Sequence, residues 1–148
     1  MIRVYLDTCC FSRPLDDQEQ LRVKLETDAV LDILEHCARG EWTLIGSAAV
    51  KTELAAIGNY ARRLGAEELA AFAMEHVTMD AEFLRRGEIL ERMGFGVYDS
   101  LHVACAEAAT ADVLLTTDDG LVRRARRMQH EVGIRVANPL TWLKERPV

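Results

Sequence analysis

The sequence has few of the residues that mark unusual classes of protein. Its 148 residues include only 4 cysteines, 3 prolines and 9 glycines, which excludes a disulfide-rich scaffold and a collagen-like or low-complexity chain. No two cysteines are spaced Cys-x-x-Cys, which argues against a zinc site. In a reducing cytosol we expect all four to be free thiols; they are Cys9, Cys10, Cys37 and Cys105.

Long hydrophobic runs are also missing. No apolar run approaches the roughly 20 residues that a membrane-spanning helix needs, and Asp7 interrupts the first apolar stretch where a signal peptide would continue. We therefore expect a cytoplasmic protein without a membrane segment. The formal net charge of −6 argues against a protein that coats nucleic acid by bulk electrostatics. It is compatible with a local basic patch, or with a cluster of acids covered by metal.

The remaining composition, 49% hydrophobic and 28% charged, is that of an ordinary globular protein. The length fits one domain over residues 1–148. Short apolar runs predict buried strands at 2–6, 42–45, 76–79, 113–116 and 134–137. Apolar residues at helical spacing predict helices over about 18–38, from the N-cap Ser47 onward, over 60–75, 80–93, 98–110 and 118–129, and from Pro139.

This alternation predicts the α/β class, with a parallel sheet of about four or five strands and helices on both faces. Ligands in such folds bind outside the carboxyl ends of the strands. Asp7 closes the first predicted strand, and Asp118 and Asp119 follow the fourth, at 113–116. Glu53 lies at the rim of the buried stripe of its helix, and Asp99 opens the helix that leads toward that later strand. We therefore expect these carboxylates to converge at one edge of the sheet.

A cluster of like charges needs a counter-charge. Without one, the carboxylates would repel each other and raise their own pKa values. Carboxylate oxygens select Mg²⁺ or Mn²⁺ over Zn²⁺, and such a set can hold one or two ions. Two ions about 3.5–4 Å apart can hold a phosphodiester and activate water for in-line displacement. The constellation therefore predicts nuclease chemistry.

Four segments that carry these acids resemble the PIN-domain ribonucleases, including the VapC-type toxins of bacterial and archaeal toxin-antitoxin pairs. The segments are residues 4–8 (VYLDT), 47–54 (SAAVKTEL), 98–104 (YDSLHVA) and 115–118 (LTTD). The resemblance covers essentially the whole chain. It implies a single PIN-like domain that cleaves RNA to 5′-phosphate and 3′-hydroxyl ends, and an antitoxin partner. Homodimers are common in the family, and the helices between residues 60 and 93 would supply the apolar surface.

The resemblance also implies roles for single residues. The metal-binding and catalytic acids of the family match Asp7, Glu53, Asp99 and Asp118, and Asp119 is a neighbour that assists or substitutes as a metal ligand.

Small polar residues near the metals would orient a water molecule or a carboxylate. By resemblance they match Thr8, Ser47 and Thr116 or Thr117. His102 lies three residues after Asp99 and either bonds a carboxylate or the substrate, or is an ordinary interior histidine. Cys9 departs from the family, because many relatives carry Asn after Asp-Thr.

The helix after Asp118 has one basic face. Its apolar residues share one arc, and the opposite arc carries Arg123, Arg124, Arg126 and Arg127. This face is either simply solvated or, together with Arg13, contacts the phosphates of a nucleic acid. Pairing with an acidic segment of an antitoxin is an equally natural use.

The leading hypothesis is a metal-dependent endoribonuclease, the toxin of a toxin-antitoxin pair. The alternative is a catalytically idle PIN-like module that binds RNA or a protein. A third reading, another enzyme on a similar sheet, has less support. Asp-Thr-Cys-Cys follows the first strand in place of a glycine-rich dinucleotide turn, and Asp7 lacks the second Asp, two residues on, of the aspartyl phosphatases.

Overall fold

One parallel sheet forms the middle of the molecule. In this computed structural model, which describes residues 1–146, its strands are β1 (Ile2–Leu6), β2 (Trp42–Gly46), β3 (Glu75–His76), β4 (Val113–Leu115) and β5 (Val136–Ala137). They lie in the order β3-β2-β1-β4-β5, and each neighbouring pair is parallel. Val4 pairs with Leu44 on one side and with Val113 on the other. The predicted α/β class with a parallel sheet of four or five strands is confirmed.

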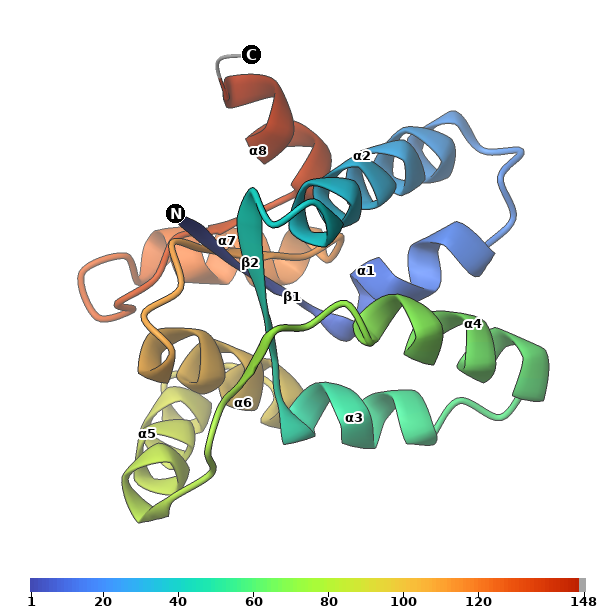
Figure 1. Cartoon of the computed structure of the whole chain (residues 1–148). Coiled ribbons are helices and arrows are strands. Elements are labelled where there is room, and N and C mark those ends of the chain that lie inside the picture. The colour runs from blue at the N-terminus through green and yellow to red at the C-terminus, as the bar shows by residue number, and fades with distance from the viewer. Residues whose placement is uncertain (147–148) are drawn as a thin grey trace.

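Helices cover both faces of this sheet (Figure 1). They are α1 (Thr8–Ser12), the 3₁₀ helix η1 (Arg13–Leu15), α2 (Leu21–Ala38), α3 (Ala48–Ala55), α4 (Tyr60–Ala70), α5 (Ala81–Arg92), α6 (Val97–Ala108), α7 (Asp119–Arg127) and α8 (Pro139–Glu145). Parallel crossovers are right-handed, so a reversal of direction along the sheet moves the helix to the other face. Accordingly α1, α2 and α4 lie on one side of β1 and β2, and α5, α6 and α7 lie on the other (Figure 1).

The core is formed where these layers meet. Val4, Tyr5 and Leu6 of the central strand are fully buried, as expected for a strand covered on both faces. At the far end of the sheet, Trp142 of α8 packs edge-on against Trp42, with ring centroids 5.3 Å apart. The two tryptophans therefore fix the last helix to the sheet. All four cysteines are free thiols, and in residues 1–146 no helix has the length and hydrophobicity to cross a membrane.

Several elements differ from their predicted extents. The strand predicted at 76–79 is β3, which is only Glu75–His76. The helix predicted over 60–75 ends at Ala70, because the chain must turn into β3 at Glu75. The last strand is only Val136–Ala137. Helix α1 directly follows Asp7 and was not predicted, since its five residues are too few to show a helical period.

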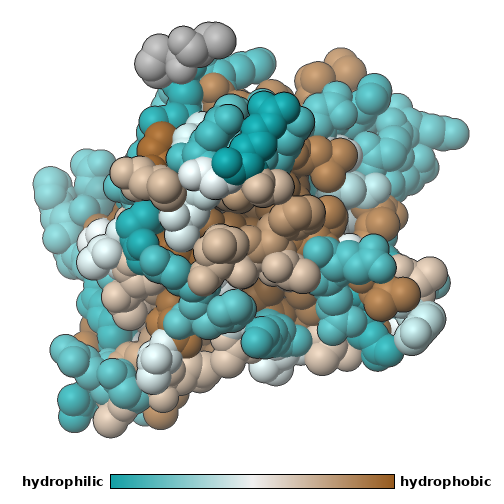
Figure 2. All heavy atoms as spheres, viewed as in Figure 1, coloured by the Kyte–Doolittle hydropathy of each residue, from teal (hydrophilic) through white to brown (hydrophobic). Residues whose placement is uncertain are grey.

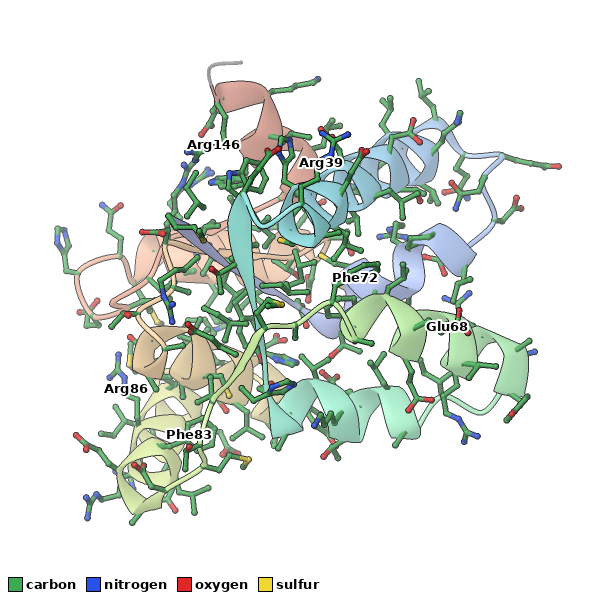
Figure 3. The ribbon with its side chains drawn as sticks, viewed as in Figure 1. Arg39, Glu68, Phe72, Phe83, Arg86 and Arg146 are labelled. Carbon is green, nitrogen blue, oxygen red and sulfur yellow. The ribbon has the colours of Figure 1, made fainter. Side chains whose placement is uncertain are left out.

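The face shown in Figure 2 has a band of apolar side chains across its middle, surrounded by hydrophilic ones. It lies between α2 and α3, over the segment that follows α4. Phe72, at the end of α4, lies in this region (Figure 3) and is 42% exposed. We call this the apolar face.

Candidate functional site

A cleft of about 470 Å³ opens at the carboxyl ends of the central strands. Asp7, Glu53, Asp99 and Asp118 all line it. They come from four different elements: the end of β1, helix α3, the first turn of α6 and the start of α7. The fold therefore brings together four acids that are widely separated in the sequence. We call this the acid cleft.

Asp7 is held by the residue that follows β4. The Thr116 hydroxyl donates to Asp7 Oδ2 over 2.8 Å, and the same hydroxyl accepts from the backbone N–H of Asp118 over 3.1 Å. Thr116 is fully buried, so its position is fixed by packing. Cys9 Sγ lies 3.4 Å from the same carboxylate oxygen of Asp7. The end of β1 and the start of α7 are thus joined through one threonine.

Glu53 is placed by the start of its helix. Ser47 is the N-cap of α3, and its hydroxyl accepts from the N–H of Val50 over 3.1 Å. Thr8 donates to Glu53 Oε1 over 2.7 Å, and His102 Nε2 bonds the same oxygen. Burial alone would raise the pKa of Glu53, but these two hydrogen bonds outweigh it and the pKa lies below its usual value.

His102 lies at the centre of a buried hydrogen-bond network. Its Nε2 contacts Glu53 and lies 3.3 Å from Asp7 Oδ1, while its Nδ1 is 2.7 Å from the Tyr5 hydroxyl. That hydroxyl is also 2.7 Å from Ser47 Oγ. Burial would lower the pKa of His102, but the bond to Glu53 and the nearby acids raise it. The contact between His102 and a carboxylate is one of the two readings that the sequence allowed.

Sequence reasoning missed Tyr5. A signal was present, because a tyrosine inside a continuous apolar strand needs a partner for its buried hydroxyl. The partners, Ser47 and His102, lie on other elements and are found only once the fold is known.

Asp99 and Asp118 both lie at helix starts. Helix α6 begins at Val97 after Gly96, so Asp99 is in its first turn and is not its N-cap. Burial, followed by the charges of Asp7 and Asp118, raises the pKa of Asp99 to about 6. Asp118 is the N-cap of α7, and its Oδ1 accepts from the N–H groups of Gly120 and Leu121.

The structure places Asp119 away from the other acids. Its carboxylate is bound by Arg22 through two hydrogen bonds of 2.8 and 2.9 Å, and it does not line the acid cleft. Thr117 also lies beside Arg22, whose guanidinium donates to the Thr117 carbonyl oxygen over 3.3 Å. Neither residue is brought to the four acids.

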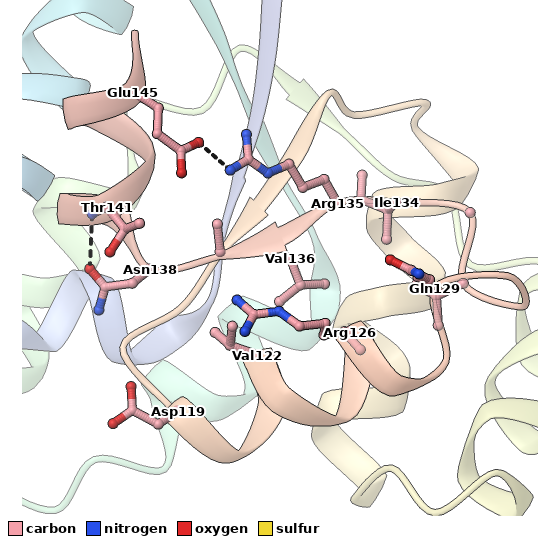
Figure 4. A pocket seen from close by; sticks show the side chains of 14 residues that line it. Asp119, Val122, Arg126, Gln129, Ile134, Arg135, Val136, Asn138, Thr141 and Glu145 are labelled. Atoms are coloured by element: carbon pink, nitrogen blue, oxygen red, sulfur yellow. Dashed lines mark hydrogen bonds and ion pairs between the residues drawn. The ribbon is translucent and has the colours of Figure 1, made fainter.

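The predicted basic residues fall into separate places. Arg13 lines the acid cleft and pairs with Asp16 over 3.0 Å. Arg126 lines a different and larger cavity of about 670 Å³ between α7 and the segment of β5 and α8 (Figure 4). Arg124 lies over Gly94, while Arg123 lines a pocket next to the acid cleft. Arg123 and Arg126 of α7 thus line different cavities.

The donor set of the acid cleft suits a hard divalent cation. Its acids are carboxylates from rigid elements, and burial together with the charges of Asp7 and Asp118 raises the pKa of Asp99. Asp7, Glu53 and His102 each offer one ligand atom, and these atoms lie within 4.8 Å of one another. The cleft is thus chemically able to hold a metal ion.

Comparisons with solved structures show proteins of the same fold. The structure is similar to VapBC2 from Rickettsia felis bound to a DNA fragment from their promoter, with a TM-score of 0.61 and 17% identity over 93% of this chain and 98% of that one. It is also similar to VapBC-1 from nontypeable Haemophilus influenzae, with a TM-score of 0.54 and 16% identity over 94% of this chain and 98% of that one. A third similar structure is FitAcB from Neisseria gonorrhoeae, with a TM-score of 0.52 and 19% identity over 92% of this chain and 97% of that one.

No curated protein sequence gives a match. The profile of the PIN domain, however, matches residues 4–127, a span that contains all four acids of the cleft. The family resemblance of the sequence is thereby confirmed, and the chain belongs to the PIN-domain family.

Proposed function

We propose that this protein is a metal-dependent endoribonuclease and the toxin component of a toxin-antitoxin pair. The observation that carries the proposal is the meeting of Asp7, Glu53, Asp99 and Asp118 in one cleft. A binding module has no need for four carboxylates in one place, and their mutual repulsion would have to be offset in some other way. Membership of the PIN-domain family supports the same chemistry.

The four acids would hold one or two Mg²⁺ or Mn²⁺ ions, because oxygen ligands favour these hard cations. Bound ions of this kind lower the pKa of water and offset the charge that develops on a phosphodiester during in-line displacement.

Each acid is oriented by neighbours that are already in place. Thr116 fixes Asp7, and Thr8 together with His102 fixes Glu53. Such outer contacts hold ligands in the orientation that the ion needs. Arg13 lies in the same cleft and would bind a substrate phosphate.

The test is cleavage of a pool of structured and single-stranded RNA by purified protein with Mg²⁺, with Mn²⁺ or with EDTA. We expect cleavage with either metal, none with EDTA, and a loss of at least a hundredfold, by the usual effect of losing a metal ligand, in Asp7→Asn and Asp99→Asn.

Asp118→Asn and Asp119→Asn form a matched pair. Asn is as good an N-cap as Asp, so Asp118→Asn removes a metal ligand and leaves α7 capped. We expect it to lose cleavage, whereas Asp119→Asn retains most of it because Asp119 binds Arg22 outside the acid cleft.

If the folded protein, free of any partner, cuts no RNA with either metal, the idle binding module becomes the better description. Direct measurement of RNA binding by the same preparation then decides between that module and a protein-binding one.

Two partners follow from the proposal. The similar structures are VapBC and FitAcB assemblies, and by analogy an antitoxin would bind this chain. A second copy of the chain would pack on the apolar face, where Leu64 and Phe72 are 43% and 42% exposed. Apolar patches of this kind on otherwise polar surfaces mark protein interfaces.

A further inference from the structure

A second pocket adjoins the acid cleft. It has a volume of about 550 Å³ and shares Arg13 and Asp118 with the cleft. Arg22 and Arg123 also line it. We call it the arginine pocket. The two cavities share lining residues, so a chain bound in one can continue directly into the other.

A buried acid positions two of the three arginines. Glu26 of α2 is only 1% exposed. Its carboxylate lies 3.2 Å from Arg13 Nε and 3.3 Å from Arg22 Nε, and it accepts from Asn138 Nδ2 over 2.5 Å. Arg22 Nε and Asn138 Nδ2 both donate to Glu26 Oε2, whereas Arg13 Nε lies near Glu26 Oε1 as an ion pair without a hydrogen bond. Glu26 therefore helps to place both arginines at the pocket.

One arginine of the pocket is available to an anion. The lining carries three arginines and three acids, the acids being Glu26, Asp118 and Asp119. Arg13 and Arg22 are engaged by these acids and by Asp16. Arg123 is exposed and forms no ion pair within residues 1–146. Its guanidinium can thus bind a phosphate without giving up an existing partner.

We propose that the arginine pocket binds the phosphate of a nucleotide next to the scissile one, and so sets the path of the RNA strand out of the acid cleft. This inference rests on the proposed function. Arg123 supplies the main contact, Arg13 lies at the boundary between the cavities, and Arg22 completes the basic wall. RNA leaving the cleft on this side passes Asp118 before it reaches Arg123.

The test uses a series of oligoribonucleotides with one cleavage site, lengthened by one phosphate at a time on either side. In the wild type, one particular added phosphate should raise kcat/KM by about tenfold, the effect of a charge-assisted hydrogen bond. Arg123→Ala should abolish that gain and leave kcat for the shortest substrate unchanged. Arg123→Lys should restore part of it, since the charge returns without the planar fork.

Arg92→Ala is the matched control, because Arg92 is an exposed arginine of α5 with a side chain 77% exposed. It should keep the full gain. If Arg123→Ala keeps the gain as well, the proposal is wrong.

A measurement of RNA binding distinguishes failure of the pocket proposal from failure of the nuclease proposal. Fluorescence anisotropy with a labelled single-stranded RNA gives the slope of log Kd against log salt, which should fall by about 0.7 when the protein no longer binds one of the phosphates. A reduced slope in Arg123→Ala without any cleavage by the wild type supports the pocket and overturns the nuclease. Normal cleavage with equal slopes in wild type and Arg123→Ala overturns the pocket alone.

Discussion

Asp99 shows how burial and neighbouring acids change the pKa of a single carboxyl group. Its burial and the charges of Asp7 and Asp118 raise its pKa to about 6. A group whose pKa is higher in the folded state than in the unfolded state binds a proton more tightly when folded. The folded protein is therefore penalised when Asp99 is charged. This penalty is absent below the unfolded pKa, grows as the pH rises, and is complete above about pH 6.

We expect Asp99→Asn to be more stable than the wild type at pH 7.5 in EDTA, by about 1 kcal/mol after allowance for partial exposure, or about 3 °C in Tm. The difference should vanish at about pH 3, below the unfolded pKa, where the wild-type carboxyl is protonated in both states. Thermal unfolding at both pH values measures it. Asp28→Asn, which changes an exposed acid of α2, should have no such effect. A lower Tm for Asp99→Asn at pH 7.5 would contradict this account.

At this scale the sequence identified residues whose position relative to a predicted strand or helix is itself informative. Asp7 follows a strand, Asp99 and Asp118 lie at helix starts, and Glu53 lies at the rim of the buried stripe of its helix; together these positions identify one edge of a parallel sheet. The signal for Tyr5 was only its buried hydroxyl, and Glu26 carries none. Glu26 lies among helical residues and looks like any solvated acid until α2 is packed against Arg13 and Asn138. Asp119 was grouped with Asp118 by adjacency, yet its side chain faces Arg22.

Among the elements, helix α2 connects the arginine pocket to the last helix, α8. Glu26 connects it to Arg13 in η1 and to Asn138, the N-cap of α8. Residue 138 lies beyond the segment that matches the PIN domain, which ends at residue 127. The last helix thus contributes to the same polar network as the arginine pocket.

Glu26→Ala should therefore destabilise the protein by about 2 kcal/mol, because it removes the carboxylate that faces the buried Arg13 Nε and accepts from the Asn138 amide. Glu35→Ala is the matched control on the same helix. Glu35 pairs with Arg39, and both side chains are more than half exposed, so its loss should cost less than about 1 kcal/mol. Urea unfolding followed by circular dichroism measures both. Equal effects of the two substitutions would show that the buried contacts of Glu26 do not stabilise the fold.

The long elements were predicted more accurately than the short ones. Helices such as α2 and α5 show several turns of apolar spacing, and the predicted N-cap Ser47 is found. Helix α1, with five residues, was not predicted, and β3, predicted at 76–79, is only Glu75–His76. Elements of this length exist because their neighbours hold them, so their local sequence contains no period to detect.

For the whole molecule, the order of the strands explains where the cleft lies. The chain leaves β1 toward β2 on one side, while β4 lies on the other. Loops at such a reversal diverge and leave a crevice at the carboxyl ends of the strands. Asp7 follows β1 and Asp118 follows β4, so both border it. The sequence predicted the parallel sheet but not this order, because strand order depends on packing between distant segments.

The apolar face predicts the state of assembly. We expect a homodimer of the 16.6 kDa chain, and Phe72→Asp should convert it to a monomer, since a charge would be buried at the interface. Light scattering after size exclusion measures the mass. Leu31→Asp is the control, because Leu31 is equally exposed, at 42%, and belongs to α2 rather than to the segment at the end of α4. A wild-type monomer, or a dimer that survives Phe72→Asp, would overturn this assignment.

The pairing of β1 with β4 has a consequence for how the protein is made. Asp7 is synthesised long before its orienting partner Thr116 and the strand beside it. The acid cleft cannot exist before these distant segments meet. A chain not yet extended through Thr116 therefore carries no assembled site. If the protein cuts RNA, the transcript being translated is exposed to that activity only after this later segment has been made.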